Sequence, residues 1–502
     1  MGDILLIEES FTEVFTRSYS GLFFYNDKDF IMYSNLYLTF PLKEEVEFLS
    51  FPESSIGQPK VEQVSKAFGA GKTYFWSVKN LNPIPDEAYS RPFAEQSLLT
   101  AFVVKSIGYH KGGEWQNTIK NFYEDYLEDD DVKADKIEDL GFPKNMKDSV
   151  ITWQDIDQLY TALRKSIVLS GFNSLYPLSE DINSIFETKK GDASDLSYIM
   201  YKILQEWNQD VNIVWIRDRR MGRFEFSVPS RLWFDRLGVK VTLNNKSKYY
   251  DFDRCIPYQY EMPWFLNPID IIVIGKDYFK KEHIKQYPRM QDNQSSESHM
   301  FTLNDDFLIC DSINIQLSGS AAQKFRGKHY TKDSDEIKQS SKNSIEKVCL
   351  SKVDTVIINN FFNNKKVNIQ LCGQSSVKAE NIENNYVISL KNFLLTNFRD
   401  DIFSVSRHSD IIFETPFEII MNWTIKIPED FKIKSGKLTY QKLQGPANTY
   451  SDINYDISDG QLKITTGVHF TQMFISYNQF PALINFLDNT IKNIEQNIVM
   501  YQ

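Results

Sequence analysis

Apolar and polar residues alternate along the first part of the chain. The segments DFIMYSNLYLTFPL and KTYFWSVKNLNPIP show this period of two, with turn-forming residues between the apolar runs. Because successive side chains of a strand point to opposite faces of a sheet, the pattern is typical of half-buried strands. We therefore predict that residues 1–110 form an N-terminal β-domain, a partial β-sandwich.

The period changes to that of a helix after residue 113. WQNTIKNFYEDYLEDD and TWQDIDQLYTALRKSIVL place apolar residues three and four positions apart, as does the segment after Gly191. Four strand-like runs follow: VNIVWIRD, RLGVKVTL, SKYYDFD and IDIIVIG. Helices packed on a sheet are therefore expected over residues 111–290. The clearest helical stripe consists of Leu196, Ile199, Met200, Ile203, Leu204 and Trp207.

The polar segment YPRMQDNQSSES, residues 287–298, has no periodicity and predicts a linker. Strand-like runs return after it, among them FLICDSINIQLSG, VDTVIINNFF and FEIIMNWTIKIP, and only PALINFLDNTIKNIEQ has helical spacing. We predict a C-terminal β-sandwich over residues 291–502. The expected fold class is thus α+β multidomain, with a central α+β core between two β-domains.

Composition and charge exclude some classes of partner. The 502 residues are 42% hydrophobic and carry a net charge of -11. Binding to nucleic acid requires clustered Lys and Arg, so no nucleic-acid partner is expected. No apolar run approaches the roughly 18 to 20 residues of a membrane-spanning helix. MGDILLIEESFTE also lacks the basic and apolar regions of a signal peptide. We predict neither a transmembrane segment nor an export signal.

The residues that usually bind metals are dispersed. Cys255, Cys310, Cys349 and Cys372 contain no Cys-x-x-Cys pair, and the six histidines are scattered. This spacing indicates neither a zinc site nor a disulfide framework, although a single bridge between two of the last three cysteines stays open. We predict no metal and no cofactor.

The segment KKGDASDLSYIMYKILQEW joins a Gly-Asp turn to the start of a helix at Ala193. A helix N-terminus stabilises a thiolate, because unpaired N–H groups and the positive end of the helix dipole lie there. Cysteine enzymes of the papain type place their nucleophile at this position. A histidine on a following strand then acts as base, and an Asp or Asn on the next strand orients it. This turn is therefore the place to search for catalytic chemistry.

The segment resembles the core of bacterial transglutaminase-like proteins, which have a papain-like fold. In them a Gly-x-Cys-x-Asp turn opens the helix, a Phe-Asn-His strand follows, and a Tyr-Trp-x-Asp strand completes the triad. Residues 190–195 match the turn, 234–236 the histidine strand and 250–253 the aspartate strand. Only the aspartate keeps its type. The three triad positions hold Ala193, Arg236 and Asp253.

The resemblance extends over nearly the whole chain. YFWSVKNLNPIPDEAYSRPF is similar to the end of an uncharacterised β-domain (DUF3857-type) that precedes the core in a family of large exported bacterial proteins. PYQYEMPWFLNPIDIIVI resembles the stretch that closes the core, and SRHSDIIFETPFEIIMNWTIKIPEDF resembles the C-terminal β-domain (DUF3858-type). MGDILLIEE matches a strand in the middle of the first domain, which implies that half of that domain is missing. The family implies a periplasmic or exported location.

The departures from the triad imply a protein without catalysis. Alanine has no nucleophile, and arginine cannot accept a proton at neutral pH. We predict an inactive transglutaminase-like protein that acts as a binding or scaffold module for a protein, peptide or glycan. Two alternatives stay open. One is amide hydrolysis or acyl transfer by a non-standard site in the same cleft, and the other is a structural role in the cell envelope.

The remaining expectations concern the former cleft. Arg236 and Asp253 are expected to pair across it, with an ordinary loop carboxylate as the alternative for Asp253. The tryptophans could form a stacking platform or a core, and Trp207, on its helical stripe, is expected in the core. Residues expected to line the cleft are Asp192, Ser194, Trp233, Asp235 and Trp264.

Overall fold

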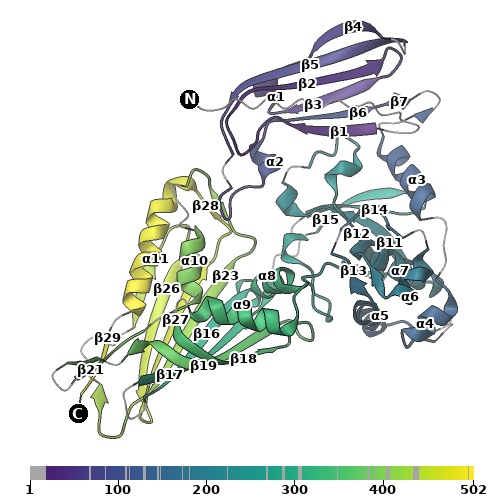
Figure 1. Cartoon of the computed structure of the whole chain (residues 1–502). Helices are drawn as coiled ribbons and strands as arrows, with labels where there is room; N and C mark the ends of the chain where they lie inside the picture. Colours follow the sequence, from purple (N-terminus) through teal and green to yellow (C-terminus); the bar gives the residue numbers. More distant parts are fainter. Residues whose placement is uncertain are drawn as a thin grey trace.

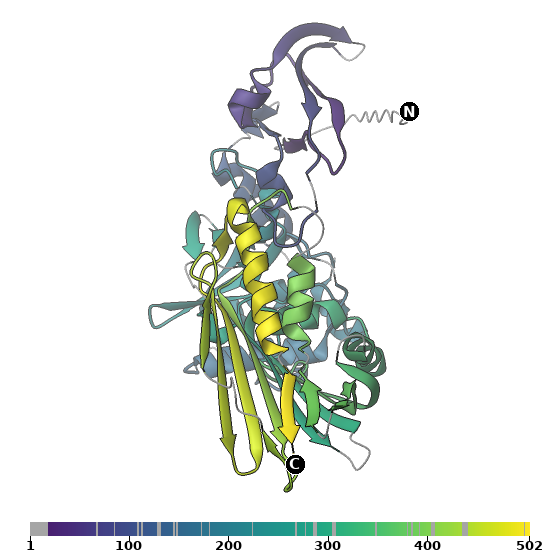
Figure 2. The same cartoon turned by 90° about the vertical axis from the view of Figure 1, so that its left-hand side faces the viewer.

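The computed structural model describes residues 19–501 apart from short gaps, the longest of which are 128–131, 285–288, 304–307, 403–406 and 434–439. The chain forms an N-terminal, a central and a C-terminal unit (Figures 1 and 2). The predictions made from MGDILLIEESFTE, a strand match and the lack of a signal peptide, concern residues outside the described part. Within that part, no helix has both the length and the apolar character needed to cross a membrane.

Two three-stranded antiparallel sheets make up most of the N-terminal unit, with strand orders β1-β6-β3 and β2-β5-β4. Phe48 of the first sheet contacts Trp76 of the second, with ring centroids 4.9 Å apart. The alternation in the sequence places such side chains on the inner faces. The elements are β1 (Tyr19–Phe24), β2 (Ile31–Pro41), β3 (Val46–Phe51), α1 (Glu53–Ile56), β4 (Lys60–Lys66), β5 (Gly69–Leu81), α2 (Phe93–Gln96), β6 (Leu99–Val104), β7 (Ser106–Ile107) and β8 (His110–Lys111).

The central unit is built on a five-stranded antiparallel sheet of order β13-β12-β11-β14-β15. Helix α7 packs on β11 and β12. The helical stripe predicted for α7 is confirmed, because all six of its residues are buried in the core of this unit. The elements are α3 (Trp115–Tyr126), α4 (Ala134–Asp139), α5 (Trp153–Ser166), β9 (Val168–Leu169), α6 (Ile182–Thr188), β10 (Lys190–Gly191), α7 (Ala193–Glu206), β11 (Asp210–Ile216), β12 (Arg236–Leu243), β13 (Lys246–Tyr250), β14 (Ile269–Ile274) and β15 (Phe279–Ile284).

The C-terminal unit contains an eight-stranded sheet of order β18-β19-β17-β16-β23-β27-β26-β25. Its neighbouring strands are antiparallel except β16 and β23. Alternate residues of β23, such as Met421 and Trp423, are buried in a core shared with α10 and α11. Its main elements are β16 (Gln294–Leu303), β17 (Leu308–Leu317), α8 (Gly319–His329), α9 (Ser334–Glu346), β18 (Leu350–Asn359), β19 (Val367–Lys378), α10 (Leu394–Ile402), β23 (Phe417–Lys426), β25 (Gln441–Gln444), β26 (Tyr450–Ser458), β27 (Gln461–Phe470) and α11 (Phe480–Ile494).

Shorter strands complete the C-terminal unit. One small sheet has the order β20-β21-β29-β24, and β22 pairs with β28. These strands are β20 (Glu380–Ile382), β21 (Asn385–Ser389), β22 (Ile411–Ile412), β24 (Lys432–Ile433), β28 (Phe474–Ile475) and β29 (Asn497–Tyr501).

The predicted fold class, a papain-like α+β core between two β-sandwiches, is wrong. Strands predominate in the described residues and are divided among eight sheets, of which the largest is the C-terminal one. Helices cover one face of that sheet where a second sheet was predicted (Figures 1 and 2). The covering helix α9 escaped prediction because it buries only Ile337 and Ile345 and so lacks a broad apolar stripe.

The predicted linker, residues 287–298, is also wrong in its second half, because β16 begins at Gln294. Glu297, His299 and Phe301 point alternately into the core. Two of these three inward positions are ionisable, so the apolar alternation of a strand is absent from the sequence. The domain limits at 110 and 290 stay a prediction. Leu99, Ala101 and Val103 of β6 already belong to the central core.

Candidate functional site

Helix α7 begins at Ala193, directly after the Gly-Asp turn. Asp192 is the N-cap: its Oδ1 accepts a hydrogen bond from the backbone N–H of Asp195 at 2.8 Å. The Asp195 carboxylate accepts one in return from the N–H of Asp192 at 2.9 Å. This reciprocal capping box starts the helix at a defined residue. Ser197 of the first turn donates to the carbonyl of Leu237 at 2.9 Å, which holds the helix start against β12.

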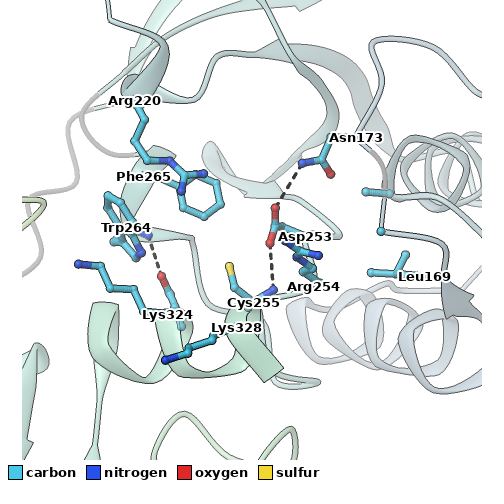
Figure 3. Close-up of a pocket in the computed structure, with 14 residues that line it drawn as sticks. Leu169, Asn173, Arg220, Asp253, Arg254, Cys255, Trp264, Phe265, Lys324 and Lys328 are labelled. Atoms are coloured by element: carbon cyan, nitrogen blue, oxygen red, sulfur yellow. Dashed lines mark hydrogen bonds between the residues drawn. The ribbon is translucent and has the colours of Figure 1, made fainter. Parts of the chain in front are cut away.

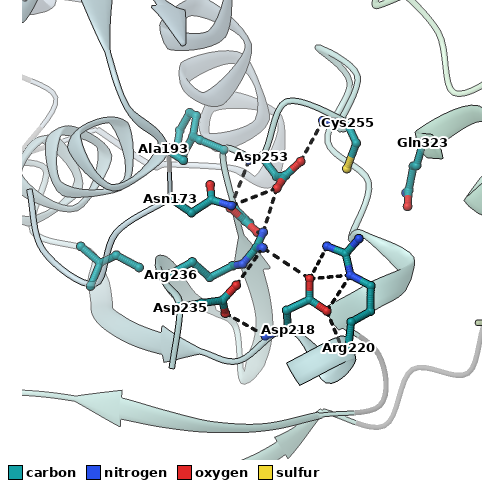
Figure 4. Close-up of polar contacts among 12 residues, drawn as sticks. Asn173, Ala193, Asp218, Arg220, Asp235, Arg236, Asp253, Cys255 and Gln323 are labelled. Atoms are coloured by element: carbon teal, nitrogen blue, oxygen red, sulfur yellow. Dashed lines mark hydrogen bonds and ion pairs between the residues drawn. The ribbon is translucent and has the colours of Figure 1, made fainter. Parts of the chain in front are cut away.

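Arg236 is the first residue of β12, and four carboxylates surround its guanidinium (Figure 4). Nη1 donates to Asp253 at 2.9 Å and to Asp251 at 3.1 Å. Nη2 donates to Asp235 at 3.1 Å and lies 3.7 Å from Asp218. We call Arg236 and these four residues the Arg236 cluster. Arg236 is only 2% exposed, so the cluster lies behind the protein surface.

The Arg236 cluster fixes the charge of its members. Although burial favours the neutral form, the surrounding carboxylates raise the pKa of Arg236 well above its ordinary value. Burial raises the pKa of Asp251 to about 6 despite the attraction of Arg236. For Asp253, burial is the largest single influence and acts in the same direction, but the attraction of Arg236 and the hydrogen bonds from Cys255 and Arg236 together outweigh it and lower its pKa to about 2. Arg236 therefore stays protonated and cannot act as a base.

A cavity of about 330 Å³ lies in front of the cluster (Figure 3). Its walls come from the central unit and from helix α8 of the C-terminal unit. Gln323 of α8 accepts a hydrogen bond from the backbone N–H of Trp264 at 2.8 Å, so the two walls touch. The cavity is lined by Leu169, Gly171, Asn173, Ala193, Arg220, Asp253, Arg254, Cys255, Trp264, Phe265, Gln323, Lys324, Gly327 and Lys328.

The structure brings together Ala193, Asp253 and Trp264 at this cavity. Arg236 is not among the lining residues, but it contacts two of them, Asp253 and Phe265. The pairing expected between Arg236 and Asp253 is present at 2.9 Å.

The other residues expected to line the cleft lie elsewhere. Asp192 and Ser194 are buried in the capping turn, where the Ser194 hydroxyl donates to Asp192 at 2.6 Å. Trp233 is a core residue whose indole N–H donates to the carbonyl of Val228 at 2.9 Å. Asp235 belongs to the Arg236 cluster and accepts from the N–H of Asp218 at 2.8 Å. None of these four residues is among those that line the cavity.

Sequence reasoning missed most of the cavity wall. Gln323, Lys324 and Lys328 lie on helix α8, at least 59 residues after Trp264 in the chain. No local spacing in the sequence therefore connects them with Ala193. Arg254 stands beside a triad position, and its charge was the one available signal of a basic wall.

Cys255, two residues after Asp253, also lines the cavity. Its side chain is 5% exposed, and burial together with the nearby Asp253 raises the pKa of the thiol well above its ordinary value. The thiol therefore stays protonated at neutral pH and is a weak nucleophile. No histidine is among the described residues that line the cavity. The cavity has the shape of a binding site without a nucleophile–base pair.

One buried cluster outside the cavity has metal-binding residue types: Glu297, His299 and Cys349. His299 already bridges two carboxylates, with Nε2 2.5 Å from Glu297 and Nδ1 2.7 Å from Asp311. Burial opposes the charged imidazole, but these carboxylates prevail and raise the pKa of His299 to about 10. His299 and its two carboxylate partners thus form a buried ion triad, next to which Cys349 lies. The Glu-x-His spacing on one strand was its signal in the sequence.

No family profile matches the chain, and no curated protein matches it. Among solved structures, the crystal structure of a putative protease from Parabacteroides distasonis is similar, with a TM-score of 0.60 over 97% of this chain and 75% of that chain. The two sequences are 8% identical. At this identity the likeness shows a shared fold and nothing about activity.

Proposed function

We propose that this chain is a catalytically inactive relative of transglutaminase-like and protease proteins that binds a peptide in the cavity beside Ala193. One observation carries the proposal. By its resemblance to the triad, position 236 is that of the catalytic base, and here four carboxylates hold Arg236 in the protonated state. Among protein, peptide and glycan, peptide is the ligand class we favour, because the cavity combines apolar and polar lining residues.

The lining supports binding without chemistry. Ala193 contributes no nucleophile, and the one thiol in the wall, Cys255, is held in its protonated form. Trp264 and Phe265, which are mostly buried, line the cavity next to polar side chains, a combination that suits a peptide side chain with its backbone. The cavity volume of about 330 Å³ accommodates one or two residues.

The first test measures turnover. Wild-type protein is incubated with fluorogenic peptides and, separately, with casein and a fluorescent amine that would report acyl transfer. We expect no turnover above the uncatalysed rate. Turnover that Trp264→Ala abolishes would refute the proposal and favour a non-standard hydrolase or acyltransferase.

The second test measures binding. A fluorescently labelled pool of casein peptides is titrated with wild-type protein, Trp264→Ala and, as a matched control, Trp153→Ala on α5, which does not line the cavity. Loss of one aromatic anchor should weaken binding about tenfold. Trp153→Ala should bind like wild type. Equal binding by all three proteins would contradict a peptide site in this cavity.

A third test examines the two lost triad positions. Ala193→Cys and Ala193→Cys/Arg236→His are compared for the rate at which the introduced thiol reacts with iodoacetamide near pH 7. A helix N-terminus favours the thiolate, and a neighbouring imidazole should favour it further. We expect faster alkylation of the double variant than of the single one. Equal rates would mean that position 236 does not serve position 193.

A further inference from the structure

The cavity is basic although the chain is acidic. The whole chain has a net charge of -11, whereas the cavity wall contains four cationic residues and a single acidic one. The acidic residue, Asp253, is neutralised by Arg236 at 2.9 Å. The four cations are Arg220, Arg254, Lys324 and Lys328.

Two of these cations already have protein partners. Arg220 binds the Asp218 carboxylate, with Nε 2.7 Å from Oδ2. Lys324 lies 2.8 Å from Glu414. A buried or half-buried pair of this kind is electrically balanced and adds little attraction for a ligand.

Arg254 and Lys328 differ from the other two. Both are exposed, and within the described part of the chain neither forms an ion pair. Nη1 of Arg254 lies 3.9 Å from the position that a Cβ would take on Gly171, so the guanidinium extends along the cavity wall. Asp401 of α10 interacts electrostatically with Lys324 and Lys328, which lower its pKa, but burial has the larger influence and raises that pKa overall. Two cations thus remain available to a ligand, one from each unit.

The aromatic part of the cavity wall lies beside the two paired cations, Arg220 and Lys324. The guanidinium of Arg220 lies 4.6 Å from the ring centroid of Phe265 and 5.3 Å from that of Trp264. Lys324 Nζ lies 5.3 Å from the Trp264 ring. Apolar surface strengthens an ion pair formed beside it, because it excludes water and lowers the local dielectric constant.

We propose, building on the peptide-binding function above, that the ligand is an acidic peptide whose carboxylates are held by Arg254 and Lys328 across the junction of the central and C-terminal units. Arg254 offers a guanidinium fork that matches a carboxylate in two hydrogen bonds. Lys328 offers a mobile point charge on the opposite wall. A peptide that alternates acidic and apolar residues offers carboxylates to these two cations and apolar side chains to the part of the wall formed by Trp264 and Phe265.

The test uses three labelled peptides of equal length that alternate leucine with glutamate, glutamine or lysine. Binding is measured by fluorescence anisotropy at low and moderate salt. We expect the glutamate peptide to bind at least about tenfold more tightly than the glutamine peptide, and to lose affinity as salt increases. The lysine peptide should bind most weakly.

Charge-reversal variants test whether Arg254 and Lys328 cause the preference for the glutamate peptide. Arg254→Glu and Lys328→Glu should each weaken binding of the glutamate peptide about tenfold, because attraction is replaced by repulsion. Lys246→Glu, at an exposed position on β13 that does not line the cavity, makes the same change in net charge and is the matched control. It should bind within about twofold of wild type. All three positions are exposed, so the variants should fold.

The outcomes separate the two proposals. Equal binding of the glutamate and glutamine peptides, unaffected by the reversals, would overturn the acidic-ligand inference and leave peptide binding intact. Failure of every peptide would overturn both. Tighter binding of an oligogalacturonate or of inorganic phosphate than of the glutamate peptide would also overturn the inference, because the cations would then serve a different class of ligand.

Discussion

Removing the Arg236 guanidinium should destabilise the protein strongly. Arg236→Met keeps an apolar side chain of similar length beside Phe265, whose ring centroid lies 4.7 Å from the guanidinium carbon. It removes the partner of the Arg236 cluster's carboxylates, of which Asp251 is 2% exposed. Breaking a buried pair by removing one partner costs about 3–5 kcal/mol. We expect a loss in the free energy of unfolding of that size near pH 8.

The destabilisation caused by Arg236→Met should become smaller as pH falls, because the carboxylates of Asp251 and Asp253 titrate. Asp251 has a folded pKa raised to about 6, so its contribution to stability is full below its unfolded pKa and is lost as pH rises through 6. Asp253 has a pKa lowered to about 2, so its contribution is present above its unfolded pKa and is lost as pH falls through 2. Without Arg236 both groups bind protons at higher pH. The variant therefore regains stability between about pH 8 and pH 5.

The measurement is urea unfolding followed by tryptophan fluorescence at both pH values. Trp207, Trp215 and Trp233 lie in the central core and report on this unit. The control is Arg289→Met, which removes a solvent-exposed pair with Asp292 and should change stability by less than about 0.5 kcal/mol. Equal losses in the two variants, or a loss that grows at pH 5, would refute the buried-charge reasoning.

Three further predictions test other parts of the structure. Because the folded pKa of His299 is raised to about 10, the stability it contributes should be complete below pH 6.5 and decline toward pH 10. Thermal unfolding measured across that pH range should show this decline for wild type and not for His299→Gln. The same decline in both proteins would count against the triad. Asp192→Ala removes the N-cap of α7 and should lower the free energy of unfolding by about 1 kcal/mol. Calorimetry would measure this loss, and Thr152→Ala at the exposed N-cap of α5 is the comparison. The exposed Cys372 should react with a disulfide reagent well before Cys255, as peptide mapping would show, and faster labelling of Cys255 would disprove its protonated, buried state.

The start of α7 could be predicted from the sequence because its signals are local. Asp192 and Asp195 form the two halves of a capping box, and the apolar stripe after them repeats with helical period. Both signals depend on residues within a few positions of one another. For the same reason Ala193 could be placed at a helix N-terminus from sequence alone.

The cavity wall and the C-terminal fold could not be predicted in this way. Gln323 meets Trp264 through packing of two units, and nothing in either segment encodes that contact. In β16, Glu297 and His299 occupy inward positions where apolar residues are expected. Their polarity is compensated by partners on β17 and at the start of α10, as when the backbone N–H of Leu394 donates to Glu297 at 2.7 Å. Such compensation becomes visible only after the chain is folded.

The parallel pairing of β16 with β23 constrains the order in which the C-terminal sheet is assembled during synthesis. Ser296 pairs with Ile420, and Phe301 pairs with Ile425. A nascent chain that ends before β23 contains β18, β19, β17 and β16, but one side of β16 then has no partner strand. The second half of the sheet, β23-β27-β26-β25, then pairs with β16, which acts as a preformed template. Until that moment the edge must be protected from pairing with another chain, so a holdase acting late in translation would have this strand to shield.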